Sequence, residues 1–258
     1  MSAEQPTVVL VPGAWTAPEA YHKLRIALEA KAFTVHVPAL PTNNGHRPPD
    51  SSFDDDVQAV RRVVQQLVEN DGKEVIMLMH SYGGVVGTTA LRGLARKDRE
   101  VQGLPGGVVH LLYAAAFLLA LNQNIRTVVQ AVNLPRGSDG LVQFAADGTW
   151  FPTDPVSLLY QDLAPEDQEE QARLLKRGNA ATLTGNATYE AWRDVPALYV
   201  RATEDGWLPP EFQDFCVKNA VDAGVAIRTA ELRSGHSPYV NFAGELAEMV
   251  VQISKLGV

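Results

Sequence analysis

An α/β doubly wound fold with a mostly parallel central sheet is predicted by the pattern of this 258-residue sequence. Short runs that are apolar at nearly every position alternate with longer helical patterns; examples are "TVVLVPG" (7–13), "EVIMLMH" (74–80) and "GVVHLLYAA" (107–115). Strands of a parallel sheet are apolar throughout because helices cover both of its faces. Ligands of such sheets bind at the carboxyl ends of the strands, so functional residues are expected there.

The remaining elements of the core continue this alternation. Helices are expected at 17–32, 53–70, 82–97, 210–222 and 240–255, and further strands at 33–40, 196–205 and 225–234. The three acids at 54–56 fall at the start of a helix, where they are expected to interact favourably with the helix dipole.

Residues 120–194 interrupt the alternation. They contain loop-forming segments such as "LPRGSDG" and "ADGTWFPTDP", the acidic "APEDQEEQ", and no clear buried strand. We expect a helical cap inserted at 120–194 into a core formed by residues 1–119 and 195–258, lying over the strand ends.

The composition narrows the class of partner. A formal net charge of −8 without a basic cluster disfavours nucleic acid and anionic membranes. The N-terminus lacks the pattern of a signal peptide, the longest apolar run (107–121) is too short to span a bilayer, and there is one cysteine, Cys216. These observations predict a cytoplasmic enzyme-like protein with a small-molecule substrate, and they leave open whether it forms a homodimer.

The segment "LMHSYGG" places Ser81 where a buried strand gives way to a helix. A serine on such a tight turn exposes its hydroxyl at the carboxyl edge of the sheet, next to a helix N-terminus that favours a developing oxyanion. The alternative is that Ser81 only caps the following helix. Met79 stands where the usual G-x-S-x-G pattern has glycine, so small residues on adjacent elements are expected to make room for its flexible side chain.

A nucleophilic serine needs a base, and His236 is the best placed of the six histidines. It lies in "RSGHSPY", between the last strand and the last helix. The others are less suitable: His22 is expected at the surface, His36 and His110 in the core, His46 in a polar loop, and His80 on the strand face opposite Ser81.

The base in turn needs a carboxylate that fixes its tautomer. Asp205 follows the penultimate strand in "ATEDGWLPPEFQ", with Glu204 as the alternative. The order Ser81, Asp205, His236 at three strand ends is that of an α/β-hydrolase, which is more specific than the serine alone.

The oxyanion hole is expected from two backbone N–H groups, those of Tyr82 and Ala14, with Trp15 as the next candidate after Ala14. Candidates for the substrate pocket are Trp15, Phe117, Leu121, Trp150, Phe151, Leu159, Trp207 and Tyr239. No dinucleotide fingerprint and no metal-ligand spacing occurs in the sequence, so neither a cofactor nor a metal is expected.

Over nearly its whole length the chain resembles the α/β-hydrolase superfamily, and within it the compact branch of plant methylesterases, hydroxynitrile lyases and microbial esterases. The resemblance is carried by "VVLVPGAW", "VIMLMHSYGG", "LLYQDLAPEDQEEQARLL", "DGWLPPEFQ" and "SGHSPY". It implies a catalytic triad of Ser81, Asp205 and His236, with the Ala14 and Tyr82 amides at the oxyanion.

Departures from the family pattern bear on the reaction. The family commonly has His-Gly where this chain has Pro12-Gly13, and the lyases carry threonine in place of Gly13 and lysine in place of Ser237. These departures favour hydrolysis of a small, largely apolar ester or lactone, such as a secondary metabolite, over cyanohydrin cleavage. Two rivals remain: carbon–carbon bond cleavage or a lyase step by the same triad, and a hydrolase-like receptor that only binds its ligand.

Overall fold

A computed structural model describes residues 5–132 and 140–256. Its centre is a six-stranded sheet in the order β2-β1-β3-β4-β8-β9, in which every neighbouring pair is parallel. The strands are β1 (Thr7–Val11), β2 (Val35–His36), β3 (Glu74–His80), β4 (Gly107–Ala114), β8 (Ala197–Ala202) and β9 (Arg228–Leu232). The predicted parallel sheet is confirmed.

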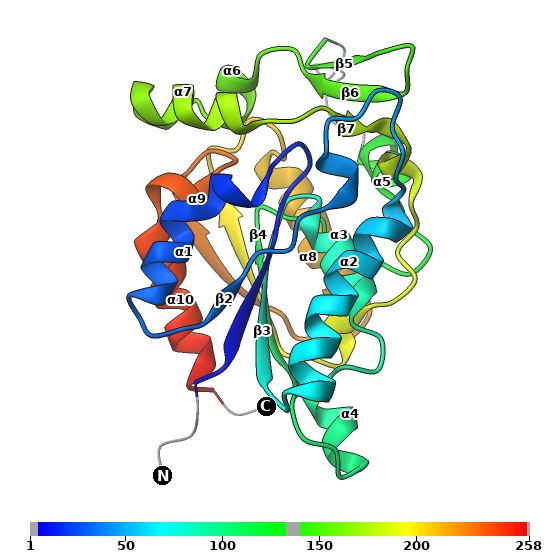
Figure 1. Ribbon diagram of the computed structural model, residues 1–258, viewed down its shortest axis with the longest axis vertical. Coiled ribbons are helices and arrows are strands. Elements are labelled where there is room, and N and C mark those ends of the chain that lie inside the picture. The colour runs from blue at the N-terminus through cyan, green and yellow to red at the C-terminus, as the bar shows by residue number, and fades with distance from the viewer. Residues whose placement is uncertain (1–4, 133–139, 257–258) are drawn as a thin grey trace.

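Helices cover both faces of the sheet (Figure 1). One face carries α1 (His22–Glu29), α9 (Pro238–Asn241) and α10 (Ala243–Ser254), and the other carries α2 (Phe53–Gln65), α3 (Gly83–Ala90) and α8 (Pro210–Asp222). Alternate strand residues serve the two layers: Val9 and Met77 pack toward α2 and α3, whereas Val8 and Ile76 pack toward α1 and α10. Residues buried on both faces explain why these strands are apolar without alternation.

Shorter elements complete the core. They are η1 (Pro18–Tyr21), η2 (Pro41–Asn43), the π-helical turn η3 (Gln66–Asn70) and α4 (Arg96–Val101). The helix expected at 82–97 is therefore two helices, α3 and α4, separated by a turn that includes Gly93 at φ +77°. The strand expected at 33–40 shortens to two residues at the edge of the sheet, followed by the irregular segment before η2.

The segment between β4 and β8 lies over the carboxyl ends of the strands (Figure 1). It holds the expected helices, and in addition a small antiparallel sheet that the sequence did not predict. Its elements are α5 (Ile125–Ala131), β5 (Val142–Phe144), β6 (Thr149–Pro152), α6 (Pro155–Leu159), α7 (Pro165–Leu174), β7 (Gly178–Asn179), η5 (Ala180–Thr184) and η6 (Ala191–Arg193). The β5–β6 turn contains Asp147-Gly148, a common hairpin signal that marks these strands in the sequence.

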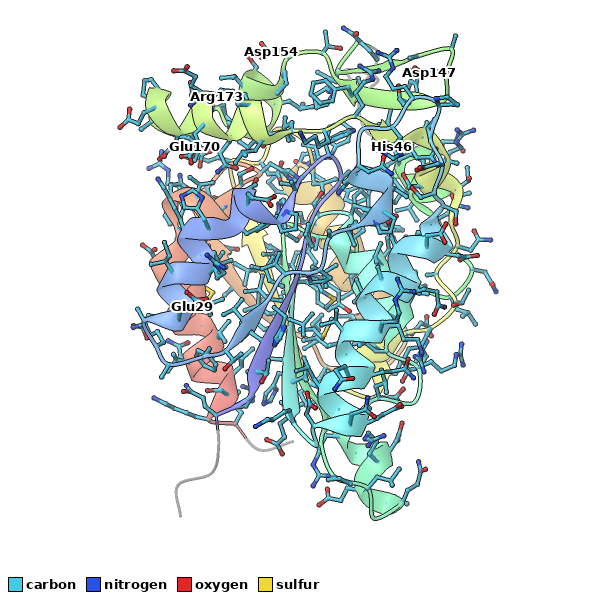
Figure 2. The ribbon with its side chains drawn as sticks, viewed as in Figure 1. Glu29, His46, Asp147, Asp154, Glu170 and Arg173 are labelled. Carbon is cyan, nitrogen blue, oxygen red and sulfur yellow. The ribbon has the colours of Figure 1, made fainter. Side chains whose placement is uncertain are left out.

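Polar contacts tie this segment to the core. Lys23 of α1 bonds Asp167 of α7 at 2.5 Å, and Arg47 bonds Asp147 at 2.5 Å. Figure 2 shows Asp147 and His46 at the same end of the molecule, where the loop before α2 meets the small sheet. In the described residues, no helix is both long and apolar enough to cross a membrane.

Candidate active site

Ser81 forms a sharp turn between β3 and α3. Its φ of +53° is sparsely populated by residues other than glycine, and neighbouring backbone bonds hold it in place. The Ser81 carbonyl accepts from the N–H groups of Phe117 (3.1 Å) and Gly84 (3.0 Å). Gly83 is needed because a Cβ there would lie 2.4 Å from the carbonyl oxygen of Val11. The Ser81 side chain does not cap α3, whose N-cap is Tyr82, so its hydroxyl is available for another partner.

Met79, the unusual residue of the turn, is accommodated by Gly87 of α3. A Cβ on Gly87 would lie 2.6 Å from the Met79 sulfur and 2.9 Å from its Cγ. The Met79 side chain therefore occupies space that Gly87 leaves free, which is the small residue on an adjacent element that the sequence led us to expect.

This packing predicts a coupled pair of substitutions. Gly87→Ala should lower the free energy of unfolding by about 1–3 kcal/mol through overpacking, and Met79→Ala by about 2–5 kcal/mol through the cavity it leaves. In the double variant the new methyl group enters the vacated space, so denaturant unfolding should show a loss smaller than the sum. Gly244→Ala in α10 is the control, because nothing lies within 4 Å of its Cβ position. Losses that simply add would contradict this contact.

The Ser81 hydroxyl lies beside His236. The distance from Ser81 Oγ to His236 Nε2 is 3.0 Å, and His236 Nδ1 lies 2.8 Å from Asp205 Oδ2. All three residues are buried. Because the carboxylate accepts a hydrogen bond from Nδ1–H, Nε2 is left as the acceptor for the Ser81 hydroxyl.

The Asp205 carboxylate is fixed from its other side. Its Oδ1 accepts hydrogen bonds from the backbone N–H groups of Trp207 and Leu208, each at 2.8 Å. The alternative acid, Glu204, is exposed and pairs with Arg233 at 2.5 Å. The geometry therefore brings Asp205, and not Glu204, to His236.

In the described residues, no other histidine is hydrogen-bonded to the Ser81 hydroxyl. His46 is exposed and pairs with Asp50, and Figure 2 shows it on the loop before α2. His110 is buried, as expected, with Nε2 3.3 Å from the Leu256 carbonyl oxygen. The prediction that His36 packs in the core is wrong: it is exposed, because β2 is a two-residue strand at the sheet edge.

The three backbone N–H groups considered for the oxyanion hole, those of Ala14, Trp15 and Tyr82, differ in whether they already have a hydrogen-bond acceptor. The Trp15 N–H donates to Asn43 Oδ1 at 2.9 Å, so it is already engaged. Within residues 5–132 and 140–256, the N–H groups of Ala14 and Tyr82 have no hydrogen-bond acceptor. Asn43 also donates to the carbonyl oxygens of Gly13 (2.8 Å) and Thr16 (3.2 Å), which holds the loop after β1 rigid.

Asp56 holds the side chain of Tyr82, the residue that supplies one of the expected oxyanion donors. The sequence had indicated only that Asp56 lies at a helix N-terminus. Its Oδ2 accepts from the Tyr82 hydroxyl at 2.7 Å and from Thr42 Oγ1 at 2.5 Å. Burial raises the pKa of Asp56 from 3.8 to about 6, against the opposing effect of these hydrogen bonds. The expected helix start is also present, since Ser52 and Asp55 form a capping box.

A cavity of about 10 Å³, enough for about one water molecule, lies beside Ser81. It is lined by Ala14, Trp15, Thr16, His80, Ser81, Leu159, Tyr160, His236, Ser237 and Tyr239. Three of the pocket candidates are therefore in its wall: Trp15, Leu159 and Tyr239. Tyr160 and Thr16 also line the cavity, although no pattern in the sequence predicted it, because only the fold brings them to this place.

The other pocket candidates lie elsewhere. Leu121 is 51% exposed, and Phe117 packs edge-on against Phe212 in the core (5.2 Å between ring centroids), so neither lines this cavity. The Phe151 ring stacks under the Arg177 guanidinium at 5.6 Å.

Trp150 and Trp207 pack on Trp15, forming a tryptophan cluster of these three residues beside the cavity. The ring centroids of Trp15 and Trp150 are 4.3 Å apart, and those of Trp15 and Trp207 are 5.6 Å apart. The cluster joins the loop after β1, strand β6 and the loop after β8. In the described residues, no group of three His, Cys, Asp or Glu side chains is placed to hold a metal ion.

Comparison with known proteins agrees with the α/β fold. The model of the alpha/beta hydrolase family matches residues 8–249. The chain is 28% identical to alpha/beta hydrolase nvfD of Aspergillus novofumigatus, over 95% of each chain, and 24% identical to methyl jasmonate esterase 1 of Vitis vinifera, over 82% of this chain and 83% of that one. The crystal structure of polyneuridine aldehyde esterase superposes with a TM-score of 0.76 at 18% identity, covering 98% of this chain and all (100%) of the other.

The chain belongs to the alpha/beta hydrolase family, and it is a hydrolase with esterases among its relatives. The predicted fold class is confirmed, as is the resemblance to the plant methylesterase branch.

Proposed function

We propose that the protein hydrolyses a carboxylic ester or lactone of a small, largely apolar molecule through an acyl-enzyme on Ser81. The proposal rests on two consecutive hydrogen bonds, from Ser81 Oγ to His236 Nε2 (3.0 Å) and from His236 Nδ1 to Asp205 Oδ2 (2.8 Å). The three residues follow the ends of three strands. The esterase relatives support the same class of reaction.

In the acylation step, His236 Nε2 takes the proton of Ser81 as the oxygen attacks the ester carbonyl carbon. The Ala14 and Tyr82 amides donate to the resulting oxyanion, and each such donor contributes about 3–4 kcal/mol in related enzymes. The carbon–oxygen bond then breaks, and His236 passes its proton to the leaving alkoxide.

Deacylation repeats the sequence with water. His236 removes a proton from the water that attacks the acyl carbon, and then returns a proton to Ser81 as the carboxylic acid leaves. Protons and bonds balance within these steps, so the proposed reaction uses no cofactor.

The surroundings favour hydrolysis over a lyase step. A Cβ at Gly13 would lie 2.9 Å from His80 Nδ1, so a threonine there, as in the lyases, would have to displace this ring. Position 237 is a serine in the cavity wall and offers no ammonium group. These features oppose cyanohydrin cleavage, and we propose residues 120–194 as the cap that determines which esters fit.

The partner and location follow from composition. We propose a small-molecule ester as the only class of ligand, with no nucleic acid and no membrane as partner, because the net charge of −8 repels polyanions. We also propose a cytoplasmic location, because a single cysteine, Cys216, suits a reducing compartment. For the small, largely apolar substrate we propose a role in secondary metabolism.

The experiment is a panel of p-nitrophenyl and methyl esters, with and without a serine-reactive phosphonate, followed by mass mapping of the adduct. Hydrolysis in ¹⁸O-water should place one solvent oxygen in the carboxylate product, and the phosphonate should label Ser81 and stop turnover. A label on another residue would overturn the assignment of the nucleophile. A product that contains no solvent oxygen would exclude hydrolysis in favour of a lyase step, and ligand binding without any turnover would favour the receptor.

A further inference from the structure

Tyr21 and His80 connect two loops of the site through a continuous series of hydrogen bonds. The Gly13 N–H donates to the Tyr21 hydroxyl at 2.8 Å, and this hydroxyl lies 2.8 Å from His80 Nδ1. His80 Nε2 lies 2.8 Å from the backbone carbonyl oxygen of His236. We call this pair of side chains the Tyr21–His80 bridge; it begins one residue before the Ala14 amide and ends on His236 itself.

The direction of every hydrogen bond in the bridge is fixed by chemistry. A carbonyl oxygen only accepts, so His80 Nε2 carries the hydrogen. Burial, reinforced by the nearby His236, holds the pKa of His80 well below its usual range, so the ring is neutral and Nδ1 is an acceptor. The Tyr21 hydroxyl then donates to Nδ1 while its oxygen accepts from Gly13. All four groups are satisfied in one arrangement.

The bridge is buried and packed against aromatic rings. Tyr21 is 0% exposed and His80 is 3% exposed. The Tyr239 ring contacts both, with centroids 4.2 Å from Tyr21 and 5.0 Å from His80. The His80 and His236 rings are 4.9 Å apart. Hydrogen bonds in such surroundings are costly to leave unmade, which makes the bridge a rigid spacer.

We propose that Tyr21 and His80 are positioning residues, whose bridge holds the oxyanion loop and His236 at a fixed separation on either side of Ser81. The inference rests on the proposed function, because it assigns the two loops their catalytic roles. His80 is joined to Ser81 by a peptide bond and is hydrogen-bonded to the backbone of His236. Through Tyr21 it is also connected to the loop that carries the Ala14 donor. Neither side chain exchanges a proton with the substrate.

The test uses Tyr21→Phe, which removes one oxygen and leaves the Gly13 N–H and His80 Nδ1 without their partner. We expect kcat to fall about 10-fold to 100-fold with KM changed less than about threefold, because displacement of an oxyanion donor affects the transition state more than substrate binding. Labelling of Ser81 by the phosphonate should slow by a similar factor.

Tyr113→Phe is the matched control. Tyr113 is also fully buried, and its hydroxyl makes one hydrogen bond, to Thr88 Oγ1 at 2.7 Å, away from the cavity. Both variants should lose stability in denaturant unfolding, but only Tyr21→Phe should lose kcat. If Tyr21→Phe keeps kcat within about twofold of wild type while its stability falls as in Tyr113→Phe, the bridge is merely structural and the inference is overturned.

Substitutions of His80 separate the two ends of the bridge. His80→Leu removes both hydrogen bonds, whereas His80→Gln retains a donor that can reach the His236 carbonyl, and His80→Asn retains an acceptor for Tyr21. We expect kcat of His80→Gln and of His80→Asn to lie between that of wild type and that of His80→Leu. The kcat values are compared after correction for the fraction of folded protein in each variant. Wild-type kcat in His80→Leu would overturn the inference. Failure of the proposed function would look different, because wild-type protein itself would then escape labelling at Ser81.

Discussion

Ser81→Ala is expected to lower kcat for ester hydrolysis by about 10⁵-fold to 10⁶-fold, the loss seen when a triad enzyme is deprived of its nucleophile. The reason is that alanine has no oxygen to form the acyl-enzyme, although the oxyanion donors and the pocket remain. The measurement is the initial rate on the best ester of the panel, together with mass analysis after phosphonate treatment. The variant should show no adduct.

Ser234→Ala is the control for this result. Ser234 is fully buried close to His236 in sequence, and its hydroxyl has no partner among the described residues. Its removal should leave kcat unchanged and should cost little stability, because no hydrogen bond of this buried hydroxyl is lost. An unchanged rate in Ser81→Ala, with the same thermal unfolding as wild type, would mean that Ser81 is not the nucleophile.

Asp205→Asn is expected to lower kcat about 10⁴-fold. The Trp207 and Leu208 amides donate to Oδ1, so the asparagine oxygen should remain there and its NH₂ group should face His236. An NH₂ group cannot accept from Nδ1–H, and His236 would shift its hydrogen to Nε2, where it can no longer accept the Ser81 proton. The measurement is kcat across pH 6 to 9, chosen because the loss should persist at every pH in this range.

Glu204→Gln provides the comparison. It is the adjacent carboxylate, but it is exposed and paired with Arg233. Its substitution should change kcat by less than about twofold, since exposed ion pairs contribute little. Equal losses in the two variants would remove the reason for preferring Asp205.

The meeting of Ser81, Asp205 and His236 could be predicted because parallel strands bring their carboxyl ends to one edge. Each residue follows a predicted strand of this sheet, and so its position in the chain indicates its position in space. The prediction for His36 failed because β2, at one edge of the sheet, is only two residues long and leaves His36 exposed.

The pocket could not be predicted in the same way. Whether Phe117 or Tyr160 reaches the cavity depends on how residues 120–194 pack on the core, which involves contacts between distant parts of the chain. His80 was interpreted only as a residue facing away from Ser81. Its bonds to Tyr21 and to the His236 carbonyl depend on backbone positions that no local pattern encodes.

The tryptophan cluster has a consequence for the affinity of substrates. The space beside Ser81 holds about one water molecule, and Trp15 forms part of its wall, so an ester fits beside the hydroxyl only when residues of this wall move. That movement reduces the observed affinity by the fraction of molecules that are open. An ester with a large apolar surface can replace the contacts that the wall residues lose, and it thereby offsets this loss of affinity. A short-chain ester has too little apolar surface to do so. Selectivity among substrates would then reside in the opening equilibrium as much as in the shape of the closed site.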